Sequence, residues 1–271
     1  MRTARQGGAG ASRRRPPPAW ALGVAGLLGL GAVLEIVPRV GLVSPQFLPP
    51  ASEMVAALLD EARSPAFWAA VRATVSAWAL GLLIAVVGGI TVGVLIGSVG
   101  VLRRATESTI EFLRPIPSVA LIPLAVLLFG TDIRSTLVLV VYASFWQVLI
   151  QVLHGVRDVD PVARETAQSY RFSRWAQVRY VAWPTALPYV LTGVRLAAAV
   201  ALILTITAEL VIGGDGLGNE IGVAQSSGAV PVMYAIVVVT GLLGVGVNLL
   251  ARLLERRVLR WHTSVRGEVP V

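Results

Sequence analysis

The amino-acid sequence predicts an all-α protein, a polytopic membrane helical bundle with six transmembrane helices. The first observation behind this prediction is composition: the 271 residues are 55% hydrophobic and only 14% charged, and the mean hydropathy is +0.75. Soluble domains carry about 25% charged residues, so a chain this apolar is expected to be surrounded by lipid. The second observation is a series of six apolar runs, compared with the roughly 20 apolar residues that one membrane-spanning helix needs.

The first apolar run, 19–37, follows an Arg-, Gly- and Pro-rich segment, 1–18, which we expect to be a disordered cytoplasmic tail. We interpret the run as a membrane span and not as a cleaved signal peptide, because no small-residue cleavage site follows it and further spans do. The other five spans are predicted at 73–100, 115–129, 136–153, 188–212 and 231–250.

A short external helix is predicted at 53–63, where apolar residues recur at helical spacing. It is too short and too charged to cross a membrane, so we expect it to lie at the interface, with Ser52 capping its start. The prediction divides the chain into four parts: the tail 1–18, a segment 19–66 with the first span and the external helix, a core 67–261 with a cytoplasmic loop 154–187, and a C-terminal tail 262–271.

Two patterns within the spans bear on helix packing. Gly89, Gly93 and Gly97 recur every four residues, and small residues at that spacing let helix backbones approach closely in lipid. Three prolines between positions 115 and 123 indicate a broken helix near a translocation path. For the first two, a simple helix start is the alternative.

The placement of arginine predicts the orientation in the membrane. All 23 basic residues are Arg. With the N-terminus inside, eighteen of them fall on cytoplasmic segments, four on external segments, and Arg195 falls within a span. This positive-inside bias predicts a multi-pass protein of the inner (plasma) membrane with both termini in the cytoplasm. Because the arginines flank apolar runs and do not form one patch, we expect membrane lipid and no nucleic acid as a partner.

The missing residue types exclude several kinds of chemistry. The chain has no Cys and only two His, far apart, so we expect no metal site. It has no Lys, and a phosphate-cradling Walker loop needs one. No Ser/His/Asp arrangement or pair of carboxylates suggests catalysis. We therefore expect a protein that is not an enzyme, has no cofactor of its own, and depends on another subunit for any ATP hydrolysis.

The longest predicted cytoplasmic loop, 154–187, is expected to form a helix–turn–helix element. Asp160 followed by Pro161 is a helix start, Ser173 can cap a second short helix, and prolines at 184 and 188 are expected to end it. Aromatic residues are mixed with arginine here, which suits a protein–protein contact. A hairpin lying on the membrane surface is the alternative.

This loop resembles the EAA loop of binding-protein-dependent ABC transporter permeases. The similarity lies in Glu165-Thr166-Ala167, in Ser173-Arg174-Trp175 and in 184–188, and further motifs in the third span and near the C-terminus extend it over roughly 70–261. The chain is most similar to the nitrate/sulfonate/taurine branch of the family. The resemblance implies the type I ABC importer permease architecture and an ATPase-coupling role for nine residues: Glu165, Thr166, Ala167, Arg171, Ser173, Arg174, Trp175, Pro184 and Pro188.

The loop departs from the family pattern at two positions. Arg171 stands where the family has Gly, and Thr166 stands where it has Ala. Glycine suits a left-handed residue between two helices, and another residue there costs about 1 kcal/mol. Either the turn differs, or Arg171 contacts the ATPase directly.

Four polar residues within the spans are candidates for a translocation path: Ser118, Gln147, Thr205 and Glu209. A carboxylate inside a membrane suggests function, but Glu209 could also lie fully solvated at the external interface. Ser118 and Gln147 could equally make hydrogen bonds between helices.

The predicted function is the transmembrane permease subunit of an ATP-binding-cassette importer for a small solute of the nitrate/sulfonate/taurine class. The resemblance implies three protein partners: ATPase subunits that bind ATP and Mg²⁺, a periplasmic or lipid-anchored solute-binding protein, and a second copy of the permease. The alternatives are a permease of the same family for a thiamine-precursor pyrimidine, or an ion-coupled secondary transporter. The latter predicts ionisable residues at the bilayer midplane and inverted repeats, and neither is evident.

Overall fold

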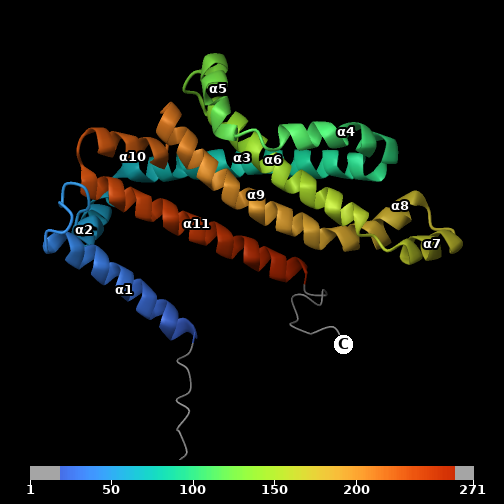
Figure 1. The fold of residues 1–271 in the computed structure, drawn as a ribbon, viewed down its shortest axis with the longest axis horizontal. Coiled ribbons are helices and arrows are strands. Elements are labelled where there is room, and N and C mark those ends of the chain that lie inside the picture. Colours follow the sequence, from blue (N-terminus) through green and yellow to red (C-terminus); the bar gives the residue numbers. More distant parts are fainter. Residues whose placement is uncertain (1–18, 260–271) are drawn as a thin grey trace, which may run out of the picture. The chain divides into compact units, whose positions relative to one another are not determined.

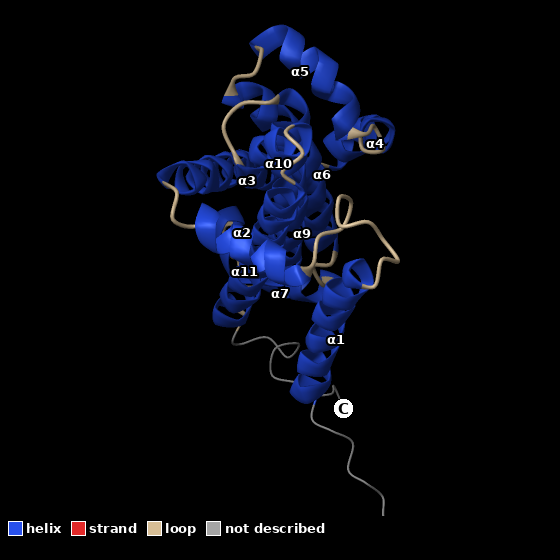
Figure 2. Cartoon of the chain, turned by 90° about the vertical axis from the view of Figure 1, so that its left-hand side faces the viewer, coloured by secondary structure: helices blue, strands red, loops and turns tan. Residues whose placement is uncertain are grey.

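The computed structural model describes residues 19–259, and every regular element in that range is a helix (Figure 2). The all-α prediction is therefore confirmed, whereas the tails predicted at 1–18 and 262–271 lie outside the described residues. The chain divides at Val55 into two compact units. Five helices between 20 and 258 are long and apolar enough to cross a membrane, and a sixth span is formed if one sharply bent helix pair is counted.

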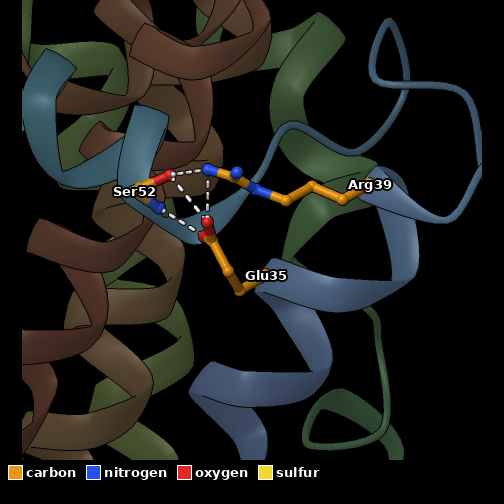
Figure 3. A network of polar contacts seen from close by, with 3 residues as sticks. All are labelled: Glu35, Arg39 and Ser52. Atoms are coloured by element: carbon orange, nitrogen blue, oxygen red, sulfur yellow. Dashed lines mark hydrogen bonds and ion pairs between the residues drawn. The ribbon is translucent and has the colours of Figure 1, made fainter.

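The first unit contains α1 (Ala19–Arg39) and the start of α2 (Ala51–Glu61). A polar cluster joins them (Figure 3). The carboxylate of Glu35 accepts hydrogen bonds from the backbone N–H of Ser52 (2.9 Å) and from its hydroxyl (3.0 Å), and pairs with Arg39 at 2.6 Å. The prediction that Ser52 caps the helix is wrong: Ser52 lies inside α2, and Glu35 supplies the acceptor for a free N–H of the first turn.

The second unit is built around α3 (Pro65–Ser98), α6 (Ile133–Arg157) and α9 (Trp183–Ile212), which pack against one another (Figure 1). α10 (Leu217–Ser226) and α11 (Val230–Val258) pack on α9. α3 begins eight residues before the predicted span of 73–100, because Pro65 provides a helix start. The helix can include Arg72, which the predicted span left out, because the side chain of Arg72 is exposed.

The glycine pattern on α3 lies against a row of valines on α6. A β-carbon at Gly89 would meet the Cβ of Val148 at 2.7 Å. A β-carbon at Gly93 would meet Val152 at 2.7 Å, and Gly81 and Gly97 face Val140 and Val156 in the same way. The prediction of close packing is confirmed: in this seam only glycine lets the two helix backbones come so near.

The span predicted at 115–129 contains a 3₁₀ turn η1 (Ser118–Leu121) and α5 (Ile122–Phe129). It is preceded by α4 (Gly100–Leu113), and the two parts form one helix pair with a bend of 83° between them. The sequence analysis predicts no helix before residue 115 in this region, but α4 is a strongly amphipathic helix whose apolar side, including Ile110 and Leu113, packs on the cluster around Trp146 of α6. The broken-helix interpretation is confirmed, and the hydroxyl of Tyr142 donates to the carbonyl of Leu113 (2.6 Å) beside the break.

Two adjacent glycines of α3 provide a matched test of the seam. We expect Gly89→Ala to lower the free energy of unfolding by about 1–3 kcal/mol, the usual effect of overpacking, because Val148 and the backbone of Leu149 leave no room for a methyl group. Gly88→Ala should be neutral or stabilising, since its β-carbon would meet only Phe145 at 3.7 Å. Thermal unfolding in detergent measures both, and equal effects would contradict close packing at the seam.

Candidate functional site

The loop after α6 forms the helical hairpin that the sequence predicts. α7 (Pro161–Ser169) begins at Asp160, whose Oδ1 accepts a hydrogen bond from the backbone N–H of Val162 (2.8 Å). The predicted start at Asp160–Pro161 is confirmed. The hairpin lies at the end of the second unit where α6 ends and α9 begins (Figure 1).

Arg171 occupies a left-handed turn between the two helices of the hairpin, with φ 55°. The backbone N–H of Phe172 donates to the carbonyl of Ala167 (2.9 Å), and that of Arg171 donates to Gln168 (2.8 Å). This pair of bonds is the Schellman motif. The same motif, with φ 72° at Gly228, ends α10. The turn therefore keeps the geometry that favours glycine, although arginine stands in it, and the alternative of a different turn is wrong.

The second helix of the hairpin continues into the next span. α8 (Arg174–Gln177) is capped by Ser173, whose hydroxyl accepts from the N–H of Ala176 (3.2 Å). A π-helical turn (Val178–Ala182) joins α8 to α9. The prediction that Pro184 and Pro188 end this helix is wrong, because both lie within α9. Pro184 falls in the first turn of α9, directly after the π-helical turn, and Pro188 lies inside the helix.

The hairpin exposes aromatic side chains. Tyr170, Trp175 and Tyr180 have exposed fractions of 76%, 68% and 65%. Phe172 contacts Tyr180 edge to face, and the guanidinium of Arg179 lies over the Tyr180 ring at 5.8 Å. Such a surface suits a partner that covers it, because aromatic and arginine side chains are enriched at protein interfaces.

Seven of the nine predicted coupling residues lie on this hairpin, and Pro184 and Pro188 lie in α9. Glu165 is exposed on α7 and makes no side-chain hydrogen bond within 19–259. Thr166 is exposed, and its hydroxyl donates to the carbonyl of Val162 in its own helix (2.7 Å). Ala167 is buried, and Arg174 is the first residue of α8.

At the opposite end of the bundle, Glu209 lies buried near the end of α9, with an exposed fraction of 2%. Its Oε2 accepts hydrogen bonds from the hydroxyl of Thr74 (2.8 Å) and from the N–H of Gly218 (3.0 Å), and the N–H of Leu217 donates to Thr74 (2.8 Å). Together these two side chains cap α10 and tie it to α3 and α9. The alternative of a solvated Glu209 is wrong.

The sequence did not single out Thr74, because nothing in its neighbourhood distinguishes it from other threonines of an apolar run. Glycine stands at positions 216 and 218, directly before and within the start of α10. A β-carbon on Gly218 would meet the Cβ of Glu209 at 2.6 Å. The glycine therefore allows α10 to start directly against the carboxylate.

Two cavities lie at the two ends of the second unit. One, of about 520 Å³, lies beside Glu209 between α3, α6 and α9, and its lining includes Asp132 and Asp215. The other, of about 590 Å³, lies between α4 and the end of α6, and its lining includes Arg103, Arg114, Gln151, His154 and Arg157 with two glutamates. Within 19–259, no group of three or more His, Asp or Glu residues could hold a metal ion.

The four predicted path residues are not brought together. Ser118 begins the 3₁₀ turn η1, Gln147 is half-buried on α6, and Thr205 is buried and donates to the carbonyl of Ala201 (2.8 Å). None of these three lines either cavity, whereas Glu209 lines the first. Their role in translocation stays a prediction.

Comparison with known proteins agrees with this architecture. Residues 86–260 match the family of the binding-protein-dependent transport system inner membrane component. The taurine transport system permease protein TauC of Escherichia coli K12 is 33% identical over 90% of this chain and 91% of its own. The putative aliphatic sulfonates transport permease protein SsuC of Bacillus subtilis 168 is 28% identical over 87% of this chain and 86% of its own.

A solved structure has the same fold. The structure of a bacterial alginate ABC transporter in complex with its alginate pentasaccharide-bound periplasmic protein contains a chain that aligns with a TM-score of 0.63 at 17% identity, covering 88% of this chain and 95% of that one. The family match spans more than half of the sequence and includes the α7–α8 hairpin. The chain therefore belongs to the inner membrane components of binding-protein-dependent transport systems, and it is the permease subunit of an ABC importer.

Proposed function

We propose that the α7–α8 hairpin docks on a separate ATPase subunit and that the chain carries a small solute of the nitrate/sulfonate/taurine class into the cell. The observation that carries the docking proposal is the exposed aromatic surface of the hairpin, at the point where α6 and α9 meet. The solute class is supported by the relatives, whose names refer to taurine and aliphatic sulfonates. The solute would arrive on a periplasmic or lipid-anchored binding protein.

The hairpin would transmit the conformational change of the ATPase subunits to the permease. ATP and Mg²⁺ would bind in the ATPase subunits, since this sequence has no lysine for a Walker loop. A second copy of the permease would complete the path. Because ATP can shift the permease only by favouring one conformation over another, closure of the ATPases must move the hairpins and so change which end of the path is open.

The helix geometry supports such a transfer of movement. From Trp175 to Ile212 the chain runs as one helical element, through the π-helical turn and without a loop. A displacement of α8 would therefore be passed directly to α9, whose far end holds Glu209. A rigid element with two arrangements is the physical requirement for coupling between distant sites.

Glu165 tests the docking proposal. An exposed carboxylate that pairs with a basic or N–H group of the ATPase contributes on the order of 1.5–3 kcal/mol, so Glu165→Arg should weaken co-purification of the ATPase by about tenfold or more. Glu61→Arg is the matched charge reversal. Glu61 ends α2, just before the start of α3 and away from the hairpin, so this change should leave co-purification of the ATPase unchanged. Equal co-purification with Glu165→Arg and with the wild-type chain would leave the hairpin on the membrane surface instead.

Arg171 tests the left-handed turn. Arg171→Gly should raise the free energy of unfolding by about 1 kcal/mol, because glycine adopts positive φ without strain. Gly228→Ala, at the same position of the second Schellman motif, should lower it by a similar amount. Thermal unfolding of the purified chain measures both changes. A loss of ATPase co-purification in Arg171→Gly would show that the arginine also contacts the partner, whereas a lower unfolding temperature would contradict the strained turn.

The orientation is tested by reporter fusions. The eighteen-to-four distribution of arginine supports a cytoplasmic location for the α7–α8 hairpin and both termini. Topology reporters inserted after residues 63, 131 and 228, which lie between helices, should all report an external location, and one inserted after residue 172 should report the cytoplasm. A cytoplasmic signal at any of the first three would reverse the proposed direction.

A further inference from the structure

We propose that the cavity between α4 and the end of α6 binds the oxyanion group of the solute, and that Arg114 is the residue that recognises its charge. The inference rests on the proposed function, which supplies a solute with a sulfonate or nitrate group and takes the hairpin end of α6 to be cytoplasmic. It adds the part of the path where that group is bound and the side chain that binds it.

The break between α4 and α5 lies near the middle of the membrane. The hydroxyl of Tyr142 donates to the carbonyl of Leu113 (2.6 Å), so the end of α4 is level with Tyr142 of α6. Tyr142 comes nine residues after the start of α6 at Ile133 and fifteen before its end at Arg157, which is about 14 Å and about 22 Å along the helix axis. Because the hydrocarbon core of a bilayer is about 30 Å thick, α4 reaches roughly half-way across it.

Charged side chains of α4 lie along this depth. α4 runs beside the half of α3 that ends at Ser98, and α5 turns away from both (Figure 1). Arg114 follows Leu113 at the break, Glu111 lies one turn before it, and both side chains are exposed. Charged residues at membrane depth face a protein interior or a water-filled cavity, because facing lipid is costly. We therefore expect this side of α4 to be turned away from lipid.

The cavity of about 590 Å³ between α4 and α6 accommodates these side chains, since both Arg114 and Glu111 line it. Its lining runs from Pro115 at the break to Arg157, the last residue of α6. The cavity therefore follows the cytoplasmic half of the membrane, where a solute that has passed the break would travel.

The cavity has more positive than negative side chains. Three arginines and two glutamates line it: Arg103, Arg114, Arg157, Glu107 and Glu111. Glu107 pairs with Arg157 at 3.9 Å, whereas Arg103 and Arg114 make no side-chain hydrogen bond or ion pair within 19–259. A guanidinium presents a fork of N–H donors that matches the oxygens of an oxyanion. A bound anion would supply the partner that these two arginines lack.

The phosphate of a lipid headgroup has the same chemistry as the solute group, but it belongs to another depth. Headgroups lie outside the hydrocarbon core of the bilayer, whereas Arg114 adjoins a break near the middle of it. The position of Arg114 therefore favours a solute in transit over a lipid of the cytoplasmic leaflet.

The absence of cysteine from the sequence allows a single reporter thiol. His154→Cys places it at an exposed position of the lining, and the His154 side chain makes no hydrogen bond or ion pair within the described residues, so the fold is kept. The purified full chain in neutral detergent would be treated with two methanethiosulfonates, one carrying sulfonate and one carrying trimethylammonium. We expect the ratio of their rates to favour the anionic reagent by about threefold or more over the ratio for a free thiol in solution, the effect of one unit charge several ångströms away.

Charge variants in the reporter background identify the residue. Arg114→Gln should abolish the preference for the anionic reagent, and Arg114→Lys, which keeps the positive charge, should retain it. Glu111→Gln should strengthen the preference, because it removes a negative charge from the same lining. Arg104→Gln changes an exposed arginine of α4 outside the lining and is the matched control. If Arg104→Gln and Arg114→Gln behave alike, the preference comes from the net charge of the chain and the proposal fails.

Protection by solutes tests the oxyanion directly. The probes are ethanesulfonate and the uncharged ethanesulfonamide, and chloride at the same concentration controls for screening by salt. Millimolar ethanesulfonate should slow the modification of His154→Cys severalfold, whereas the sulfonamide and chloride should leave it unchanged, and Arg114→Gln should remove the protection. Equal protection by all three, or by none, would overturn the proposal. Protection by phosphatidylglycerol without protection by ethanesulfonate would assign the cavity to a lipid headgroup and would also overturn it.

The two proposals fail separately. Modification and protection need neither ATP nor an ATPase. A protected cavity in a chain that does not assemble with an ATPase would contradict the docking proposal alone. An unprotected cavity in a chain that supports solute uptake would contradict the oxyanion site alone.

Discussion

The closeness of α3, α6 and α9 is the constraint on which the rest of the second unit depends. Lipid tails are as apolar as leucine, so helices in a membrane associate through van der Waals contact and a few hydrogen bonds. Glycines on α3 face valines on α6, and Gly155 and Gly193 serve the α6–α9 contact, with β-carbon positions only 2.9 Å from Ala186 Cα and Gln151 Cβ. Hydrogen bonds such as Trp78 to the carbonyl of Ala198 (2.9 Å) join α3 to α9.

This three-helix core determines the geometry of both functional ends. At one end, the separation of α6 and α9 fixes the base of the hairpin that exposes its aromatic residues. At the other end, α3 and α9 bring Thr74 and Glu209 within hydrogen-bond distance across a separation of 135 residues in sequence. A movement of α9 would alter the two ends together, because α9 contributes to both.

Backbone strain is found at one of these two ends and a buried carboxylate oxygen without a partner at the other. Arg171 is the non-glycine residue with positive φ among 19–259, and it lies in the docking hairpin. Glu209 and Trp146 are the described side chains with a buried polar atom that lacks a partner, and Glu209 lies at the opposite end. Residues that are costly to hold in place tend to occur where a partner or ligand completes them. The hairpin would be completed by a protein.

The sequence by itself determined the fold class and the start of the hairpin at Asp160–Pro161, because these depend on composition, hydrophobic runs and capping chemistry within a few residues. Six spans were predicted, and the structure has five, or six if the bent pair of α4 with η1 and α5 counts as one. The glycine seam was also predictable, since small residues at four-residue spacing face one side of a helix. The amphipathic helix 100–113 was missed because its charged and hydroxyl residues give it the composition of a polar loop. The caps provided by Glu35 and Glu209 were missed because each joins a side chain to a helix start elsewhere in the chain. Only the tertiary structure decided that Glu209 is buried and half-paired, because burial depends on which helices surround a residue and not on its own neighbours in sequence.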